Sequence, residues 1–233
     1  SSSMLAQDFK PNRLEAAKEV AKSFILDREG DRLGIIVFAG QSFIQCPLTT
    51  DTDVLSKFVE QINIIDKEHD GTAIGMAIAN AINRLRFTES KNKLMILLSD
   101  GSNNRGELDP ITAAELASKF NIKIYTIGAG TLGRAPYPTK DIWGRSKVQM
   151  MDVEVDEETL KEIAKVTGGR FFRATDNFSL KEIYNEINKL ERTKIEVTEY
   201  RNYKELYSWL TIPAAFLSLC FILFSQPLFR KKM

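Results

Sequence analysis

The stretch KLMILLSDGSNNRG, residues 93–106, begins as an apolar run and ends in small, polar residues typical of turns. Its first half predicts a buried β-strand from Lys93 to Ser99, because a short run that is apolar nearly throughout is typical of a central strand in a parallel sheet. A second such run, IKIYTIG, extends from Ile122 to Gly128, and a segment with helical periodicity separates the two. Two buried strands joined by a helix indicate a parallel sheet.

The same alternation continues on both sides of this pair of strands. Helices are expected at 14–25, 52–62, 73–85, 111–119, 157–166 and 178–190, and further strands at 33–39, 42–46 and 169–173. The junction FAGQSF between the first two of these strands predicts a hairpin at a sheet edge. The predicted fold class is therefore α/β, a doubly wound, mainly parallel sheet with helices on both faces.

Composition excludes two classes of protein. The 32 basic and 31 acidic residues are spread along the 233-residue chain and give a formal charge of +1, which is no electrostatic footprint for nucleic acid. Cys46 and Cys220 are the two cysteines, so a framework of disulfides is not expected. The length suits one domain with additional segments.

The C-terminal region predicts a membrane anchor. No charged residue occurs from Leu206 to Phe229, and a helix of this length crosses a hydrocarbon core of about 30 Å. Tyr207 and Trp209 stand where interfacial aromatic residues occur, and the basic tail at 230–233 predicts a cytoplasmic end. A buried C-terminal helix is the alternative. The expected organisation is a domain at 1–192, a linker at 193–205, a transmembrane helix at 206–229 and the tail.

Three loops carry the residues that point to chemistry. In doubly wound folds ligands bind at the carboxyl ends of the parallel strands. The stretches SSSM at 1–4, DGTAIG at 70–75 and SDGSNN at 99–104 are expected there. Their hydroxyl and carboxylate oxygens are hard ligands that suit Mg²⁺, Mn²⁺ or Ca²⁺.

These loops resemble the metal-ion-dependent adhesion site of von Willebrand factor A (VWA) domains, which begins Asp-x-Ser-x-Ser and is completed by a Thr and an Asp from two later loops. By this resemblance Ser1 and Ser3 match the paired serines, Thr72 the threonine and Asp100 the aspartate. The stretches MLAQDFKPNRLEAAK and VTGGRFFRATD, with the apolar tail, are similar to the membrane-anchored Bat aerotolerance branch of bacterial proteins.

The resemblance implies a function and a location. It implies a divalent cation, Mg²⁺ or alternatively Mn²⁺ or Ca²⁺, that recognises an acidic residue on a partner protein. It also implies work beside a MoxR-type ATPase and sister VWA proteins in an envelope assembly. The domain would lie on the periplasmic side of the inner membrane.

One departure from the family pattern concerns the start of the chain. The pattern places an Asp two residues before Ser1, at the end of a first central strand, and neither is in the sequence. We therefore expect a chain that lacks its first strand, an unpaired slot in the sheet and an incomplete metal site. The alternative is a three-residue cloning scar ahead of a natural start at Met4.

Each site residue also has a purely structural interpretation. Thr72 precedes a predicted helix and suits the role of N-cap, whose hydroxyl accepts a bond from a first-turn amide. Asp100 with Gly101 is a common turn after a strand. The metal interpretation rests on three loops that match in order.

Two enzyme interpretations are weaker. GAGTLG at 128–133 matches the dinucleotide fingerprint, but the prolines that follow exclude the helix that this motif requires, so we expect a surface loop with contact residues Tyr137 and Trp143. His69 is the one histidine available as a catalytic base, and it lies in a polar loop without a nucleophile elbow. The sequence thus predicts a binding protein rather than an enzyme, with a metal-independent structural scaffold as the alternative.

Overall fold

The computed structural model describes residues 1–64, 70–90, 92–100, 103–131, 133–140, 146–153, 155–192 and 207–225. The chain divides into two compact units, Ser1–Lys194 and Ile195–Met233. The predictions for His69, Trp143, the 193–205 linker and the 230–233 tail lie outside the described residues.

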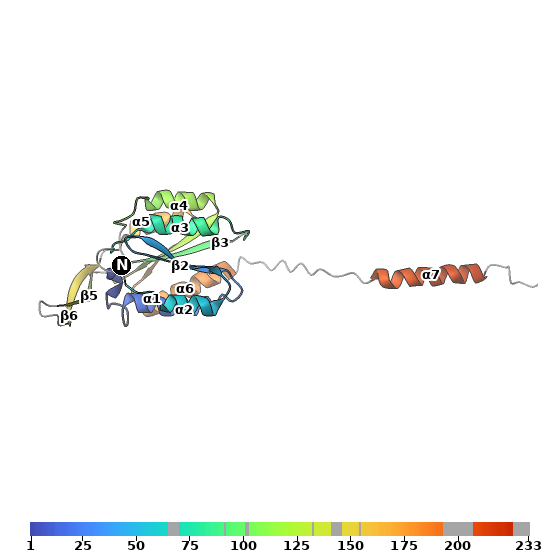
Figure 1. Ribbon diagram of the computed structural model, residues 1–233, viewed down its shortest axis with the longest axis horizontal. Helices are drawn as coiled ribbons and strands as arrows, with labels where there is room; N and C mark the ends of the chain where they lie inside the picture. The colour runs from blue at the N-terminus through green and yellow to red at the C-terminus, as the bar shows by residue number, and fades with distance from the viewer. Residues whose placement is uncertain are drawn as a thin grey trace, which may run out of the picture. The chain divides into compact units, whose positions relative to one another are not determined.

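The first unit alternates helices and strands along the chain (Figure 1). Its helices are the short 3₁₀ helix η1 (Ser2–Leu5), α1 (Arg13–Leu26), α2 (Thr52–Glu60), α3 (Ile74–Leu85), α4 (Pro110–Lys119), α5 (Glu157–Val166) and α6 (Asn177–Arg192). Its strands are β1 (Leu33–Phe38), β2 (Ser42–Thr49), β3 (Lys93–Ser99), β4 (Ile122–Ala129), β5 (Gly133–Lys140), β6 (Ser146–Val153) and β7 (Phe171–Ala174).

A parallel ladder in the order β3, β4, β7 forms the centre of this unit. Leu97 pairs with Thr126 in β4, and Thr126 pairs in turn with Phe171 in β7. β4 is buried nearly throughout, and Ile124 and Ile127 are fully buried. This burial explains why its sequence is an almost continuous apolar run, and the predicted parallel sheet is confirmed.

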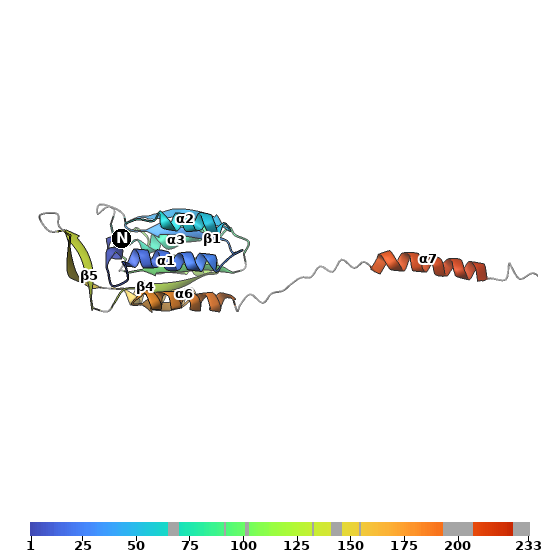
Figure 2. The same cartoon turned by 90° about the horizontal axis from the view of Figure 1, so that it is seen from below.

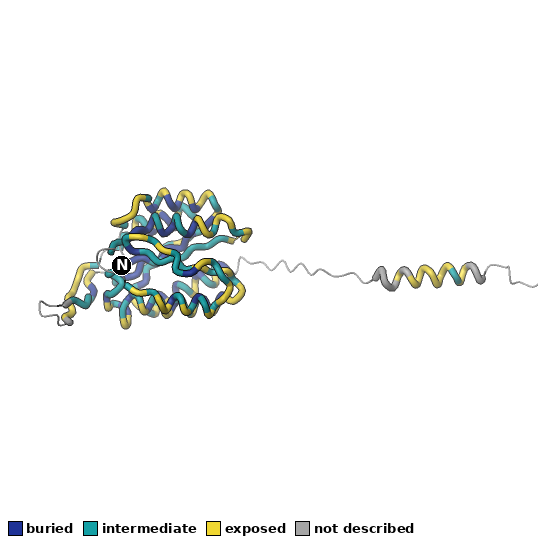
Figure 3. The backbone as a smooth tube through the Cα atoms, in the orientation of Figure 1, coloured by how far each residue is buried: buried dark blue, intermediate teal, exposed yellow. Residues whose placement is uncertain are grey.

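Helices cover both faces of the parallel ladder. Figure 1 shows α3, α4 and α5 on one side and α1, α2 and α6 on the other, and Figure 2 shows the second group from its outer side. The buried residues lie on the inner sides of the helices (Figure 3). One apolar cluster packs α1 and α6 against the ladder, and another packs α3, α4 and α5 against it. The doubly wound α/β architecture is therefore confirmed.

Most helices begin at a residue that caps its own first turn. The side chains of Asn12, Asp51, Asp109 and Asp156 accept hydrogen bonds from main-chain amides at the starts of α1, α2, α4 and α5. Such caps satisfy amides that have no partner within the helix. Helix α3 differs, because it follows Ala73, which has no polar side chain.

The predicted hairpin is formed by β1 and β2, which pair antiparallel. Among the described residues these strands form a ladder of their own, and β1 has no pairing with β3. In the described part of the chain, β1 and β3 thus each have one edge without a partner strand. The missing strand itself stays a prediction.

The expected surface loop after GAGTLG is wrong in part, because β5 and β6 form an antiparallel hairpin there. Tyr137 pairs with Gln149 and Pro138 pairs with Val148 in this hairpin. The prolines do exclude a helix, but an edge strand tolerates a residue without an N–H group.

The second unit contains helix α7 (Tyr207–Ser225), with Pro213 inside it. Several of its large apolar side chains, among them Phe216 and Phe221, are exposed. Within the described ranges no helix reaches the length and apolarity needed to cross a membrane. The transmembrane helix predicted at 206–229 is therefore not found there.

Candidate metal centre

The serine loop at the N-terminus and the carboxylate at the end of β3 form one hydrogen-bonded chain of oxygens. The Ser1 and Ser3 hydroxyl oxygens lie 2.8 Å apart. The Ser3 hydroxyl donates to Oδ1 of Asp100 over 2.8 Å. Helix η1 brings the two serines together, and the parallel strand β3 delivers Asp100 to the carboxyl edge of the sheet. Three of the four predicted ligands are thus neighbours, although their metal-binding role stays a prediction.

Asp100 is deeply buried, at 5% exposure. Its second oxygen, Oδ2, accepts a hydrogen bond from Nη1 of Arg13 over 3.2 Å. Burial raises the pKa of Asp100, while Arg13 and the Ser3 hydroxyl oppose that rise in part. Both carboxylate oxygens are therefore engaged by neighbouring side chains.

Arg13 lies between two acidic side chains. Besides Asp100 it contacts Asp8, with Nη2 2.6 Å from Oδ2 and Nε 2.8 Å from Oδ1. The side chains of Arg13 and Asp8 are only 3% and 2% exposed. Burial alone would raise the pKa of Asp8, but hydrogen bonds from Arg13 and from the amide of Thr131 outweigh it and lower that pKa.

Thr72, the fourth predicted ligand, is buried at 5% exposure but is not the N-cap of α3. The helix begins at Ile74, whose amide donates to the side-chain oxygen of Asn103 over 2.8 Å. The helix is thus capped from the loop after β3 rather than from its own sequence. The capping interpretation of Thr72 is wrong, because the helix begins one residue later than that role requires.

The Thr72 loop is fixed to both neighbouring loops. The Thr72 amide donates to Oδ1 of Asn104 over 2.9 Å, and the Asn104 amide donates back to the Thr72 carbonyl over 3.1 Å. On the other side, the Ser2 amide donates to Oδ1 of Asp70 over 2.8 Å. The Ser2 hydroxyl donates to the second oxygen of the same carboxylate. The three predicted loops therefore meet at one edge of the sheet.

The sequence interpretation did not assign roles to five residues of this network: Asp8, Arg13, Asp70, Asn103 and Asn104. Arg13 and Asp8 lie in the stretch MLAQDFKPNRLEAAK, and the others lie in or beside the two later loops. Their places in or near the quoted motifs could have drawn attention to them. Their contacts with residues far away in the sequence, such as that between Arg13 and Asp100, are set by the fold and cannot be predicted from one sequence.

The donor set suits a hard divalent cation. Hydroxyl and carboxylate oxygens are the ligands that Mg²⁺, Mn²⁺ and Ca²⁺ prefer. Throughout the described part of the chain, no group of three or more His, Cys, Asp or Glu side chains is placed to hold a metal. The four predicted ligands thus comprise three hydroxyls and one carboxylate, that of Asp100.

The β5–β6 hairpin is attached to the serine loop. The Tyr137 hydroxyl donates to the Ser2 carbonyl over 2.9 Å, and the Gln7 amide donates to the Pro136 carbonyl over 2.8 Å. Figure 1 shows the N-terminus at the end of the domain from which β5 and β6 project. This hairpin is therefore the nearest candidate for a second contact with anything that binds at the loops.

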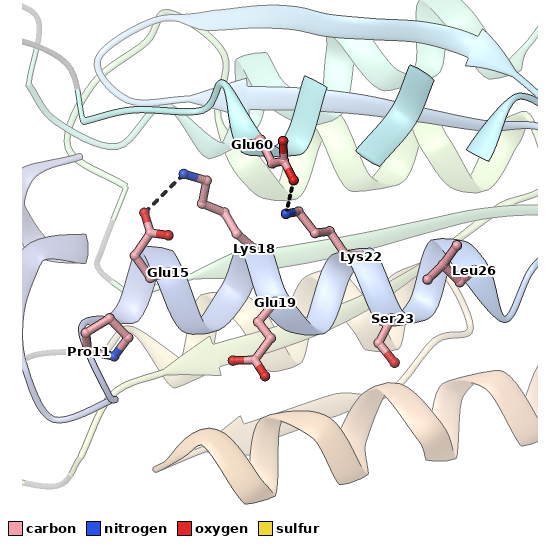
Figure 4. A pocket seen from close by; sticks show the side chains of 8 residues that line it. All are labelled: Pro11, Glu15, Lys18, Glu19, Lys22, Ser23, Leu26 and Glu60. Atoms are coloured by element: carbon pink, nitrogen blue, oxygen red, sulfur yellow. Dashed lines mark hydrogen bonds and ion pairs between the residues drawn. The ribbon is translucent and has the colours of Figure 1, made fainter. Parts of the chain in front are cut away.

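Two other regions carry less chemistry. After GAGTLG the chain enters β5, where a dinucleotide site would require a helix. A shallow hollow lies along α1 and is lined by Pro11, Glu15, Lys18, Glu19, Lys22, Ser23, Leu26 and Glu60 (Figure 4). Its lysines are paired, Lys18 with Glu15 and Lys22 with Glu60, as is usual for a solvated surface.

Comparison with known proteins supports the resemblance seen in the loops. Residues 1–186 match the von Willebrand factor type A domain. The chain belongs to this family. An uncharacterised protein from Borreliella burgdorferi is 31% identical over 97% of the chain. The match covers 66% of that relative's own length.

Two solved structures resemble the domain closely. BatB from Bacteroides thetaiotaomicron is 34% identical, with a TM-score of 0.68, over 82% of this chain and 95% of that one. An aerotolerance-related membrane protein from Bacteroides fragilis is 34% identical, with a TM-score of 0.66, over 81% and 94%. This VWA domain is thus of the Bat-like kind, and such domains generally mediate protein interactions.

Proposed function

We propose that this VWA domain binds a divalent cation, with Mg²⁺ as the physiological ion, and uses it to recognise an acidic residue on a partner protein. The ligands would be the hydroxyls of Ser1, Ser3 and Thr72 and the carboxylate of Asp100. The protein would act by binding and not by catalysis.

The observation that carries this proposal is the hydrogen-bonded chain from Ser1 through Ser3 to Asp100. It gathers hard oxygen atoms from two loops at the edge of the sheet where ligands bind in such folds. A site with several neutral hydroxyls and one carboxylate leaves a bound divalent cation with residual positive charge. A carboxylate of a partner supplies the complementary charge.

We further propose that the protein is anchored in the inner membrane, with the VWA domain on the periplasmic side. The uncharged sequence at 206–229 and the basic tail at 230–233 support this location. So does the membrane protein among the similar structures. Work beside a MoxR-type ATPase and sister VWA proteins rests on resemblance to the Bat branch.

The anchor is tested by fractionation. The full chain is expected in the membrane pellet after washing with alkaline carbonate, and a chain that ends at Arg192 in the supernatant. An equal distribution of the two chains would contradict a membrane anchor at 206–229.

The cation-dependent recognition is tested with peptides. Displayed random peptides are captured on the immobilised protein in Mn²⁺ and eluted with EDTA. We expect the eluted peptides to share an Asp or Glu, and their Asn or Gln counterparts to bind at least about tenfold more weakly because the charge on the ligand is lost. Capture by an Asp100→Asn variant should fail, and melting curves establish that this variant is folded.

A metal-independent scaffold is the alternative function. The engagement of both Asp100 oxygens by Ser3 and Arg13 favours it, because the network is complete without a cation. Peptides or partners that bind equally in Mn²⁺ and in EDTA would support the scaffold and reject the metal bridge.

A further inference from the structure

Arg13 occupies an unusual place beside the candidate metal site. Its side chain is 3% exposed, and its Nη1 atom lies 3.2 Å from Oδ2 of Asp100, the carboxylate oxygen that Ser3 does not contact. A buried arginine with a fixed positive charge therefore shares Asp100, the one charged residue among the four predicted ligands.

A cation at Asp100 would meet this charge at short range. Two positive charges repel, and the repulsion is stronger in a buried site than in water because the surroundings screen it less. A cation and Arg13 also compete for Oδ2 of the same carboxylate. Arg13 should therefore oppose cation binding while it keeps Asp100 in position.

Asp8 reduces the effect of Arg13 on cation binding. Its carboxylate makes two hydrogen bonds with Arg13, at 2.8 and 2.6 Å, whereas Asp100 makes one at 3.2 Å. Asp8 is itself held by the amide of Thr131 over 3.0 Å. Asp8 thus shares the guanidinium with Asp100 and makes the shorter hydrogen bonds to it, so it neutralises part of the positive charge.

We propose that Arg13 and Asp8 form a charge balance that sets how tightly the site holds its divalent cation, with Arg13 weakening binding and Asp8 strengthening it. This inference rests on the proposed function. Both residues are positioning residues, because neither is among the predicted ligands. A site balanced in this way exchanges its cation readily until the carboxylate of a partner adds negative charge.

The test measures Mn²⁺ affinity of the full chain by calorimetry and by the Mn²⁺-dependent shift of the melting temperature. Arg13→Met should tighten binding at least about tenfold, because a nearby positive charge is removed. Asp8→Asn should weaken binding several-fold, because Arg13 is then neutralised by Asp100 alone. If Arg13 and Asp8 had a purely structural role, both substitutions would change the Mn²⁺ affinity in the same direction, because each breaks the same Arg13–Asp8 ion pair.

Arg28→Met is the matched control. Arg28 is also buried, at 7% exposure, and pairs with Asp31, but it lies beyond the opposite end of α1. Its substitution should lower stability and leave Mn²⁺ affinity unchanged. If Arg13→Met does not fold, Arg13→Gln removes the charge and keeps N–H donors for Asp8 and Asp100.

The outcomes separate the two proposals. Tighter binding by an Arg13 variant and weaker binding by Asp8→Asn would support the charge balance, even where the unsubstituted chain binds weakly. If the unsubstituted chain binds Mn²⁺ and the substitutions leave its affinity unchanged or shift it in one direction, the charge balance is rejected and the metal site stands. If neither the unsubstituted chain nor any variant binds Mn²⁺, the proposed metal function fails and the charge balance fails with it.

Discussion

The hydroxyl of Tyr137 donates a hydrogen bond of 2.9 Å to the main-chain carbonyl of Ser2. It joins the β5–β6 hairpin to the loop that carries Ser1 and Ser3, across 135 positions of sequence. The hairpin therefore supports the candidate site, and its conformation and that of the serine loop depend on each other.

Substitution of Tyr137 by Phe should loosen the serine loop. The loss of one partly buried hydrogen bond should cost about 1 kcal/mol of stability and reduce Mn²⁺ affinity, because Ser1 and Ser3 are then less ordered. Tyr125→Phe is the control, since the Tyr125 hydroxyl donates to Glu191 at the other end of the domain. The control should lose stability without loss of affinity. Equal Mn²⁺ affinities of the Tyr137 and Tyr125 variants would contradict a supporting role for the hairpin.

Gly75 permits α3 to approach the segment before α4. A Cβ atom at this position would lie 2.0 Å from the main-chain oxygen of Leu108, so Gly75→Ala should lower the free energy of unfolding by at least about 2 kcal/mol. This clash exceeds the gain of up to about 1 kcal/mol expected from replacing glycine in a helix.

Gly168→Ala provides the comparison for this clash. Gly168 has a positive φ of 72° and no atom within 4 Å of the added carbon, so its substitution should cost only about 1 kcal/mol of backbone strain. Urea denaturation measures both variants. A smaller loss for Gly75→Ala than for Gly168→Ala would show that the close approach is not maintained in solution.

Local patterns in the sequence predict the alternating elements well. The nearly continuous apolar runs of β3 and β4 correspond to strands in the structure, because helices cover both faces of the parallel ladder. The sequence does not predict the hairpin of β5 and β6, because the two prolines and one glycine in GRAPYPTK are typical of a loop. The pairing of residues such as Tyr137 and Gln149 across the two strands depends on their packing in the folded protein, which a local stretch of sequence does not reveal.

The candidate site was predictable only in its loops. Resemblance placed Ser3 and Asp100 in matching motifs, and the structure brings them within hydrogen-bond distance. The buried pair of Arg13 and Asp8 has no local signal, since an arginine at the start of an amphipathic helix is usually exposed. The cap on α3 likewise comes from Asn103, 29 residues away.

Stability should fall in alkali through Tyr184. Burial raises the pKa of this tyrosine from 10.0 to about 12, and its ring packs against Phe24 with centroids 5.4 Å apart. The unfolded chain therefore releases this proton first, so the stabilising contribution is complete below pH 10 and is lost as the pH rises to about 12. At higher pH the loss approaches a few kcal/mol, because a change of one in a pKa corresponds to about 1.4 kcal/mol.

Denaturant titrations at several pH values measure this effect, with Tyr184→Phe as the comparison. The variant lacks the ionisable hydroxyl, so its stability should decline less between pH 10 and 12, while the other titrating groups affect both proteins alike. Parallel declines would show that Tyr184 ionises as freely in the folded protein as in the unfolded chain.

Asn103 and Asn104 are adjacent residues with different expected roles, so they form a matched pair. Asn103 caps α3 through the amide of Ile74, whereas Asn104 exchanges two hydrogen bonds with the main chain of Thr72. Each substitution by Ala should cost about 1 kcal/mol of stability, one through a lost cap and the other through a lost hydrogen bond. Only Asn104→Ala should also weaken Mn²⁺ binding several-fold, because it loosens Thr72, whose hydroxyl is a predicted ligand.

Thermal melts and Mn²⁺ calorimetry on both variants measure these effects. Equal losses of affinity, or unchanged affinity in both variants, would contradict a specific role for Asn104 in positioning Thr72.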